Sequence, residues 1–208
     1  MNATRTPMNC SARVGSIVAF MLLLAACSSP APPRYHSLLP AQTQLRAAAG
    51  NSTAAWQLLP VSIPTQVDQP QFVVRRADDT FAVLEQERWI APLGDEFRAA
   101  LSEHFAANLG PPGAAPAPGR KDWRIAVDVQ RFDSVPGRST LVAQWALLAG
   151  GDTPALRCRS VYEQPVGSGV PALAGGHRQA VAQLGAAIAL ALTALDGGRA
   201  AACPTAPS

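Results

Sequence analysis

The 208-residue sequence predicts an α/β protein of the α+β type, with a single, mostly antiparallel or mixed sheet and two helices packed on one face. Three observations lead to this fold class. Short β-type segments occur in two sets of three, a long segment with helical apolar spacing follows each set, and turn-forming residues separate the segments. The expected order of elements is therefore β-β-β-α-β-β-β-α.

The first set of strands precedes the first helix. Trp56–Ile63 is predicted to be an edge or bulged strand, because Pro60 interrupts it and cannot donate to a sheet ladder. Gln71–Arg76 and Thr80–Gln86 are rich in β-forming residues, and the turn Ala77–Asp79 lies between them. These two segments are expected to pair as a hairpin.

The first helix is predicted over Leu93–Leu109. Its apolar residues recur every four positions and form one stripe: Leu93, Phe97, Leu101, Phe105 and Leu109. Asp95 and Glu96 stand in the first turn, where the helix dipole favours acidic side chains, and Gly110-Pro111 ends the helix. Trp89 comes just before this helix and is expected to be buried against Phe97 or Leu93.

The second set of strands reads as an antiparallel meander. In Trp123–Gln130, apolar and polar residues alternate, which is typical of a strand with one buried and one solvated face. Leu141–Leu147 repeats the pattern after the loop Asp133–Ser139, and Leu156–Glu163 follows. The inner face of the third strand would carry Cys158.

The second helix is predicted to begin between Pro171 and His177 and to end before Gly197-Gly198. Its core stripe consists of Val181, Leu184, Ile188, Leu192 and Leu195. No charged residue occurs from Gln179 to Leu195, so the helix is buried on most sides or used at an interface. The alternative is a membrane span, against which the short length of the stretch argues.

The N-terminus has the features of an export signal. Arg5 and Arg13 are followed by the apolar stretch Val14–Ala26, which is shorter than the roughly 20 residues of a membrane span. Leu24–Cys27 (LAAC) looks like a bacterial lipobox, in which the cysteine thiol is acylated after the signal peptide, residues 1–26, is removed. The alternative is an ordinary secretory cleavage site with a chance cysteine.

Residues 27–34 are expected to form the lipidated Cys27 and a proline-rich tether. Ser28–Arg34 (SSPAPPR) spans only about 20 Å at roughly 3 Å per residue. The folded domain, 35–208, should therefore stay close to the lipid surface. By resemblance to known lipoprotein sorting, Ser28 in place of Asp favours the outer membrane, with the domain facing the periplasm.

Charge and cysteine content narrow the function further. The formal charge is +3, and loss of Arg5 and Arg13 leaves 15 basic and 14 acidic residues, which excludes a nucleic-acid-binding footprint.

Cys10 leaves with the signal peptide and Cys27 is acylated, so Cys158 and Cys203 remain as a pair in an oxidising compartment. We expect a disulfide, with two buried free thiols as the alternative.

The sequence has no catalytic or metal-binding motif. There is no HExxH, CxxC, GxSxG or phosphate-binding GxxxxGK[ST] motif. Glu85, Glu87 and Asp95 are interpreted as surface partners of Arg88 and Arg98 from their spacing. We therefore predict neither an enzyme nor a cofactor.

Two runs carry a resemblance to a known family. The first is a P-V-x-I/V-P…D-x-P-Q run with Pro60, Pro64, Asp68, Pro70 and Gln71, and the second is an R-W-x-x-P-L run with Arg88, Trp89, Pro92 and Leu93. With Cys27–Leu39, Asp122–Asp133 and the Ala-rich last helix, they resemble the PqiC/YmbA-type lipoproteins, or ABC-type transport auxiliary lipoprotein components. Glu87 stands where family members often have Asp.

This resemblance implies a non-catalytic subunit of an MCE-type ABC transport system for intermembrane lipid trafficking and envelope integrity. The implied partners are an MCE-domain protein that spans the periplasm and an inner-membrane permease and ATPase. The motif residues would have structural or partner-contact roles. Two alternatives are a structural lipoprotein that assists assembly of another envelope complex, as a secretin pilot does, and a periplasmic hydrolase.

The last helix is also a candidate interface. Small residues surround its core stripe: Ala186, Ala187, Ala189, Ala191 and Ala194. This surface, or the solvated face of the sheet, is expected to contact the MCE-domain protein or a sister subunit in a homo-oligomer. The alternative is that the loops Gly110–Lys121 and Ala41–Ala54 cover the helix.

Overall fold

The structure is a computed structural model that describes residues 31–39, 54–112, 121–151 and 153–204. Residues 33–208 form one compact unit. The lipobox and Cys27 lie outside the described residues. The elements are β1 (Arg34–His36), β2 (Ala55–Leu58), β3 (Gln71–Arg75), β4 (Phe81–Trp89), α3 (Leu93–Leu109), β5 (Asp122–Val135), β6 (Arg138–Ala149), β7 (Pro154–Pro165) and α4 (Val170–Asp196).

The predicted fold class is confirmed, but the strands form two sheets rather than one. One sheet has the order β1-β4-β3 and the other β2-β5-β6-β7. β3 lies alongside β5 and is joined to it by side chains, since Arg75 donates to Asp133 at 3.1 Å. The edge of β5 on this side is already hydrogen-bonded to β2 and to Ser62, which accepts from Val129 at 2.9 Å.

The expected strand pairings are present within each sheet. β3 and β4 form the antiparallel hairpin, and β5, β6 and β7 form the antiparallel meander. β2 is an edge strand, as predicted, and pairs in parallel with β5. The predicted strand Trp56–Ile63 is shorter in the structure, because β2 ends at Leu58 and only an isolated bridge at Ser62 continues the pairing.

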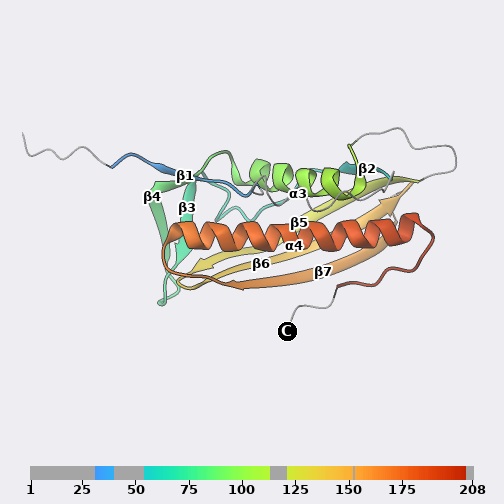
Figure 1. Cartoon of the computed structure of the whole chain (residues 1–208). Helices are drawn as coiled ribbons and strands as arrows, with labels where there is room; N and C mark the ends of the chain where they lie inside the picture. Colours follow the sequence, from blue (N-terminus) through green and yellow to red (C-terminus); the bar gives the residue numbers. More distant parts are fainter. Residues whose placement is uncertain (1–30, 40–53, 113–120, 152, 205–208) are drawn as a thin grey trace, which may run out of the picture. The chain divides into compact units, whose positions relative to one another are not determined.

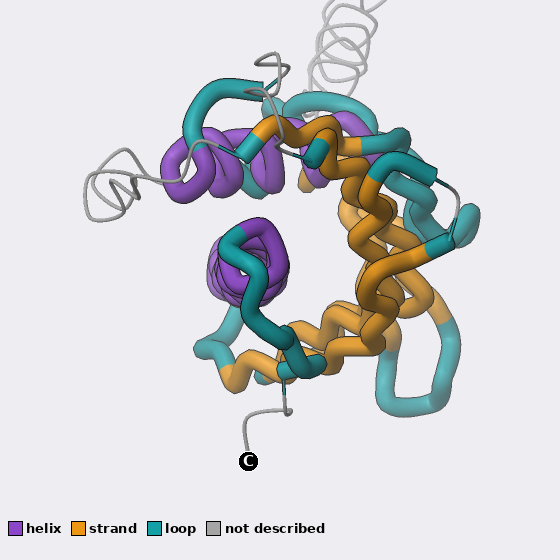
Figure 2. Tube along the Cα trace, turned by 90° about the vertical axis from the view of Figure 1, so that its right-hand side faces the viewer, coloured by secondary structure: helices purple, strands orange, loops and turns teal. Residues whose placement is uncertain are grey.

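Figure 2 shows α4 inside the curve of the strands and α3 beside it, at the upper end of that curve. α4 runs along β6 and β7 and packs against α3 (Figure 1). The predicted α3 stripe is at most 1% exposed. Gly185 permits the close approach of the helices, since a Cβ there would lie 3.0 Å from Cβ of His104. The core therefore lies between the helix pair and the concave face of the strands.

α4 combines a buried stripe with one exposed side. By length and composition, the helix could cross a membrane. In this fold it is a core helix, because Leu184, Ile188 and Leu192 are 0% exposed. Leu190 is 75% exposed, and Ala186 is exposed beside it.

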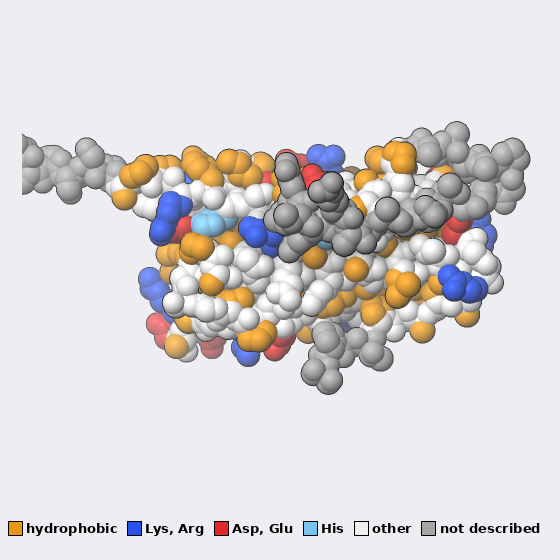
Figure 3. All heavy atoms as spheres, in the orientation of Figure 1, with side chains coloured by type: hydrophobic (Ala, Val, Ile, Leu, Met, Phe, Trp, Pro, Cys, Tyr) orange, Lys and Arg blue, Asp and Glu red, His pale blue; other side chains and the backbone are white. Residues whose placement is uncertain are grey.

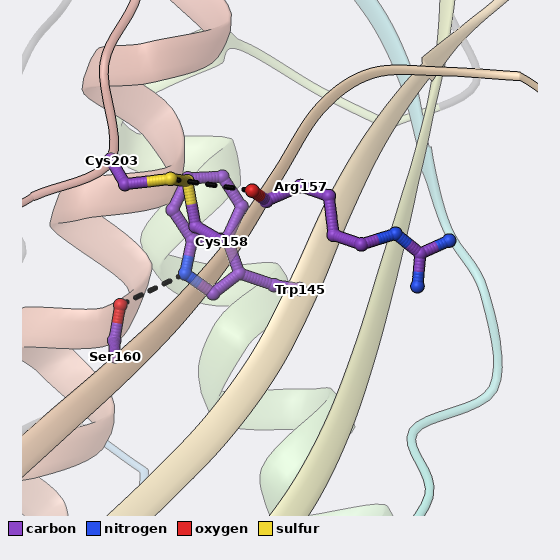
Figure 4. The surroundings of a disulfide bond; sticks show 5 residues. All are labelled: Trp145, Arg157, Cys158, Ser160 and Cys203. Atoms are coloured by element: carbon purple, nitrogen blue, oxygen red, sulfur yellow. Dashed lines mark hydrogen bonds between the residues drawn. A yellow bond between two sulfur atoms is a disulfide. The ribbon is translucent and has the colours of Figure 1, made fainter.

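The structure contains the expected disulfide between Cys158 and Cys203 (Figure 4). The chain after α4 folds back onto β7, and the sulfur of Cys203 lies 3.3 Å from the carbonyl oxygen of Arg157. Cys158 faces Trp145 on β6, whose indole donates to Ser160 at 3.0 Å. The bond closes a 45-residue loop around α4, and such a loop stabilises a fold by about 2–4 kcal/mol.

Candidate functional site at the tether-proximal corner

Most of the two motif runs meet at one corner, where the chain enters the domain. The backbone N–H of Trp89 donates to the carbonyl of Pro70 at 2.8 Å, and Gln71 pairs with Arg88. Pro92, three residues after Trp89, is the N-cap of α3. The motifs thus join the hairpin to the start of the first helix.

The remaining motif residues lie in the segment that leads into this corner. Pro60 follows β2, and Pro64 accepts hydrogen bonds from the N–H groups of Val67 and Asp68 at 3.0 and 3.1 Å. The side chain of Asp68 is exposed. This part of the motif forms a turn, and Ile63 beside Pro64 lies against the start of α3, where a Cβ on Gly94 would be 3.7 Å from its side chain.

β1 enters this corner as a parallel edge strand. Arg34, Tyr35 and His36 pair with Glu87, Arg88 and Trp89 of β4. The N–H of Ile90 donates to the carbonyl of His36 at 2.9 Å. We call residues 34–39 the strap, because they connect the predicted tether to the domain.

A buried carboxylate holds the first half of the strap. Glu87 is 6% exposed, and it accepts hydrogen bonds from the guanidinium of Arg34 and, at 2.6 Å, from Nε2 of His36. Burying a carboxylate is costly unless it is paired. The interpretation of Glu87 as a surface partner of a nearby arginine is therefore wrong.

The two other proposed surface pairs are present. Arg88 lies 3.8 Å from Glu85, and Arg98 lies 3.2 Å from Asp95. Glu87 differs from Glu85 because the pairing register shifts between them, from Phe72–Leu84 to Gln71–Arg88, so that the inward face of β4 changes after Glu85. Alternation along the sequence puts both glutamates on the face of Trp89, so it could not have separated the buried one from the exposed one.

A second buried carboxylate holds the other half of the strap. Glu96 on α3 is 3% exposed and accepts from Oγ of Ser37 and from N–H of Leu38, both at 2.7 Å. Arg178 on α4 donates to the carbonyl of Ser37 at 3.2 Å. The strap is thus held by hydrogen bonds to the hairpin and to both helices.

An aromatic cluster supports the strap from inside. The ring centre of Trp89 lies 4.9 Å from Phe72, 6.0 Å from Phe132 and 6.5 Å from His36. Phe97 contacts Phe132 at 5.2 Å. Trp89 is buried as expected, at 4% exposure, but its aromatic ring partners come from β1, the hairpin and β5 rather than from α3.

His177 on α4 completes this cluster as a neutral side chain. Its ring stacks on Phe132 at 3.7 Å, and its Nε2 shares a hydrogen bond of 2.8 Å with Oγ of Ser134. Burial lowers the pKa of His177 to about 3. A serine–histidine pair performs catalysis only where substrate can reach it, and these residues are 3% and 0% exposed. We therefore assign this pair a structural role.

The described part of the chain offers no metal site, since no group of three or more His, Cys, Asp or Glu side chains is placed to bind an ion.

Comparison with known proteins decides the family. A family model described as ABC-type transport auxiliary lipoprotein component matches residues 36–189. The chain belongs to this family. The matched region begins within the strap and includes both motif runs and most of α4.

Two crystal structures share the fold. One is of an uncharacterised protein with 19% sequence identity, a TM-score of 0.62, and coverage of 77% of this chain and 99% of that one. The other is protein XCC0632 from Xanthomonas campestris, described as family DUF330, with 18% identity, a TM-score of 0.60, and coverage of 73% and 92%. No match was found among curated proteins.

Proposed function

We propose that this auxiliary lipoprotein is a non-catalytic subunit of an MCE-type ABC transport system, anchored to the outer membrane through acyl chains on Cys27. In this proposal, residues 1–26 are the signal peptide, 27–34 the lipidated tether and 35–208 the domain that faces the periplasm. The domain would hold one end of an MCE-domain protein that connects it to an inner-membrane permease and ATPase. The system would move lipids between membranes and maintain envelope integrity.

The observation that carries this proposal is the family match over residues 36–189. The strap supports it physically. A domain that holds a partner against a membrane needs a fixed attachment point, and two buried carboxylates and Arg178 provide one. A flexible attachment would lower the effective concentration of the domain at its partner.

The exposed side of α4 is our candidate for the partner surface. A groove of about 490 Å³ runs between the helices, and His104, Asn108, Gln179 and Ala186 line part of it. We propose that the MCE-domain protein or a second copy of this chain packs here, because small side chains allow close approach of another backbone. The loops Gly110–Lys121 and Ala41–Ala54, which the sequence offered as an alternative cover for this helix, lie largely outside the described residues.

The Cys27→Ala variant tests the anchored function. In a strain that lacks the gene, the wild-type protein should fractionate with the outer membrane, incorporate a fatty-acid probe and restore resistance to detergent. The variant should lose all three, because no acyl chain then holds it. Ser29→Ala, which leaves the lipobox intact, is the matched control. A Cys27→Ala protein that remains in the membrane and still takes up the probe would contradict the lipid anchor.

A further inference from the structure

We propose that the outer face of the three-stranded sheet rests on the lipid surface that carries the anchor, with Tyr35 and Ile90 at the level of the headgroups. We call the exposed residues Tyr35, Ile90, Val83 and Phe81 the apolar face. The proposal rests on the proposed lipid anchor at Cys27. It adds the orientation of the domain and names a second, non-covalent membrane contact.

Exposed apolar side chains are concentrated at this face. Of the five large hydrophobic side chains that are exposed in the described part of the chain, four belong to it. Their exposed fractions are 56% for Tyr35, 58% for Ile90, 45% for Val83 and 44% for Phe81. Isolated exposed apolar residues are normal, whereas a group of them on one surface marks a contact site.

The pairing register places these residues on one side of the sheet. His36 and Trp89 are register partners that point into the core, so their neighbours Tyr35 and Ile90 point outward. The hydrogen bond from Ile90 to His36 keeps these two neighbours together.

The hairpin continues the same surface. After the irregularity between Gln71 and Phe72, the buried Phe72 pairs with Leu84, so the adjacent Val83 faces outward. Phe81 lies two residues before Val83 and therefore on the same side, where the guanidinium of Arg75 covers its ring at 4.6 Å. Figure 3 shows hydrophobic side chains along the upper left, near the end at which β1 lies.

The length of the tether favours a membrane as the occupant. Seven residues, Ser28–Arg34, separate Cys27 from Tyr35, and a proline-rich chain of that length reaches about 20 Å. The apolar face begins at the first strand after the tether. It is therefore the first large surface of the folded domain that an anchored chain brings to the lipid.

The chemistry of the face matches the membrane interface. A tyrosine ring has an apolar body and a polar hydroxyl, and such side chains concentrate at headgroup level. The neighbouring arginines are neutralised, since Arg34 pairs with Glu87 and Arg88 with Glu85. We therefore expect the contact to form on uncharged phosphatidylcholine as well as on anionic lipid.

Vesicle quenching tests this orientation. In the mature chain, residues 27–208, Cys27 is the only thiol outside the disulfide, so it can be coupled to a maleimide-bearing lipid in phosphatidylcholine vesicles. Tyr35→Trp adds a fluorophore at the apolar face, and Leu190→Trp adds one at the exposed position on α4. The four native tryptophans are at most 4% exposed and give the same background in both variants.

We expect bromine-labelled phosphatidylcholine to quench about half of the fluorescence added by Tyr35→Trp, and little of that added by Leu190→Trp. Replacing a third of the lipid by phosphatidylglycerol should not change this result. Equal quenching of both variants, or quenching of neither, would overturn the proposed orientation. A third result would also overturn it: no quenching, together with a dimer that light scattering detects in the wild type and not in Tyr35→Ser. The apolar face would then lie between two copies of the chain.

The chemical coupling separates this result from the anchor itself. If Cys27 is not acylated in cells, protein that is expressed with its own signal sequence and then purified shows no added mass from acyl chains. The proposed anchor then fails. The maleimide-coupled protein still reports whether the apolar face contacts the bilayer.

Discussion

Replacing Trp89 by alanine should lower the free energy of unfolding by about 3–5 kcal/mol. The indole is 4% exposed and lies between Phe72 of the hairpin and Phe132 of β5. Its removal leaves a cavity beneath the strap at a point where the two sheets meet. Denaturant unfolding of the mature chain with Cys27→Ser would measure the loss as a lower midpoint.

The neighbouring residue provides the control. Ile90→Ala changes a side chain that is 58% exposed and should alter the free energy of unfolding by no more than about 0.5 kcal/mol. An unchanged midpoint for Trp89→Ala would show that the aromatic cluster does not hold the hairpin to β5. Equal losses in the two variants would contradict the burial difference between these positions.

His177 should make the folded state less stable as the pH falls below about 6.5. The pKa of His177 is about 3 in the folded protein, because burial disfavours the charged ring, whereas an unfolded histidine titrates near 6.5. Between these values the unfolded chain binds a proton that the folded chain does not. The stability is therefore complete above the unfolded pKa and decreases by about 1.4 kcal/mol per pH unit below it.

The His177→Gln variant isolates this contribution. It should be less stable than the wild type at pH 7, because stacking on Phe132 is lost. The difference in the free energy of unfolding between the two proteins should shrink by about 2.3 kcal/mol from pH 6.5 to pH 4.5, because the unfolded histidine is already half protonated at pH 6.5. Parallel pH profiles of the two proteins would contradict a buried neutral histidine at this position.

The regular elements could be predicted because their patterns are long. In α3, five apolar residues follow one another at intervals of four, and in β5 apolar and polar residues alternate from Trp123 onward. The buried face of each element was therefore evident from the sequence. Both patterns reflect burial within a single element. The disulfide followed from the number of cysteines left after export, which is independent of the fold.

The strap could not be predicted in this way. β1 has three residues in a proline-rich segment, too few for any periodicity to show. It is a strand because β4, some 50 residues later, offers a free edge, and because Glu87 accepts hydrogen bonds from the side chains of Arg34 and His36. The two-sheet arrangement has the same origin, since it depends on which segment occupies the edge of β5.

The most direct test of the proposed function is capture of its partners. The lipidated protein would be purified through a C-terminal affinity tag from mildly cross-linked envelopes, with the Cys27→Ala protein as the control. We expect the MCE-domain protein, the permease and the ATPase to copurify with the wild type and to be strongly depleted with the variant. Envelopes in which the wild type captures none of the three, or captures a secretion channel instead, would contradict a role in MCE-type lipid transport.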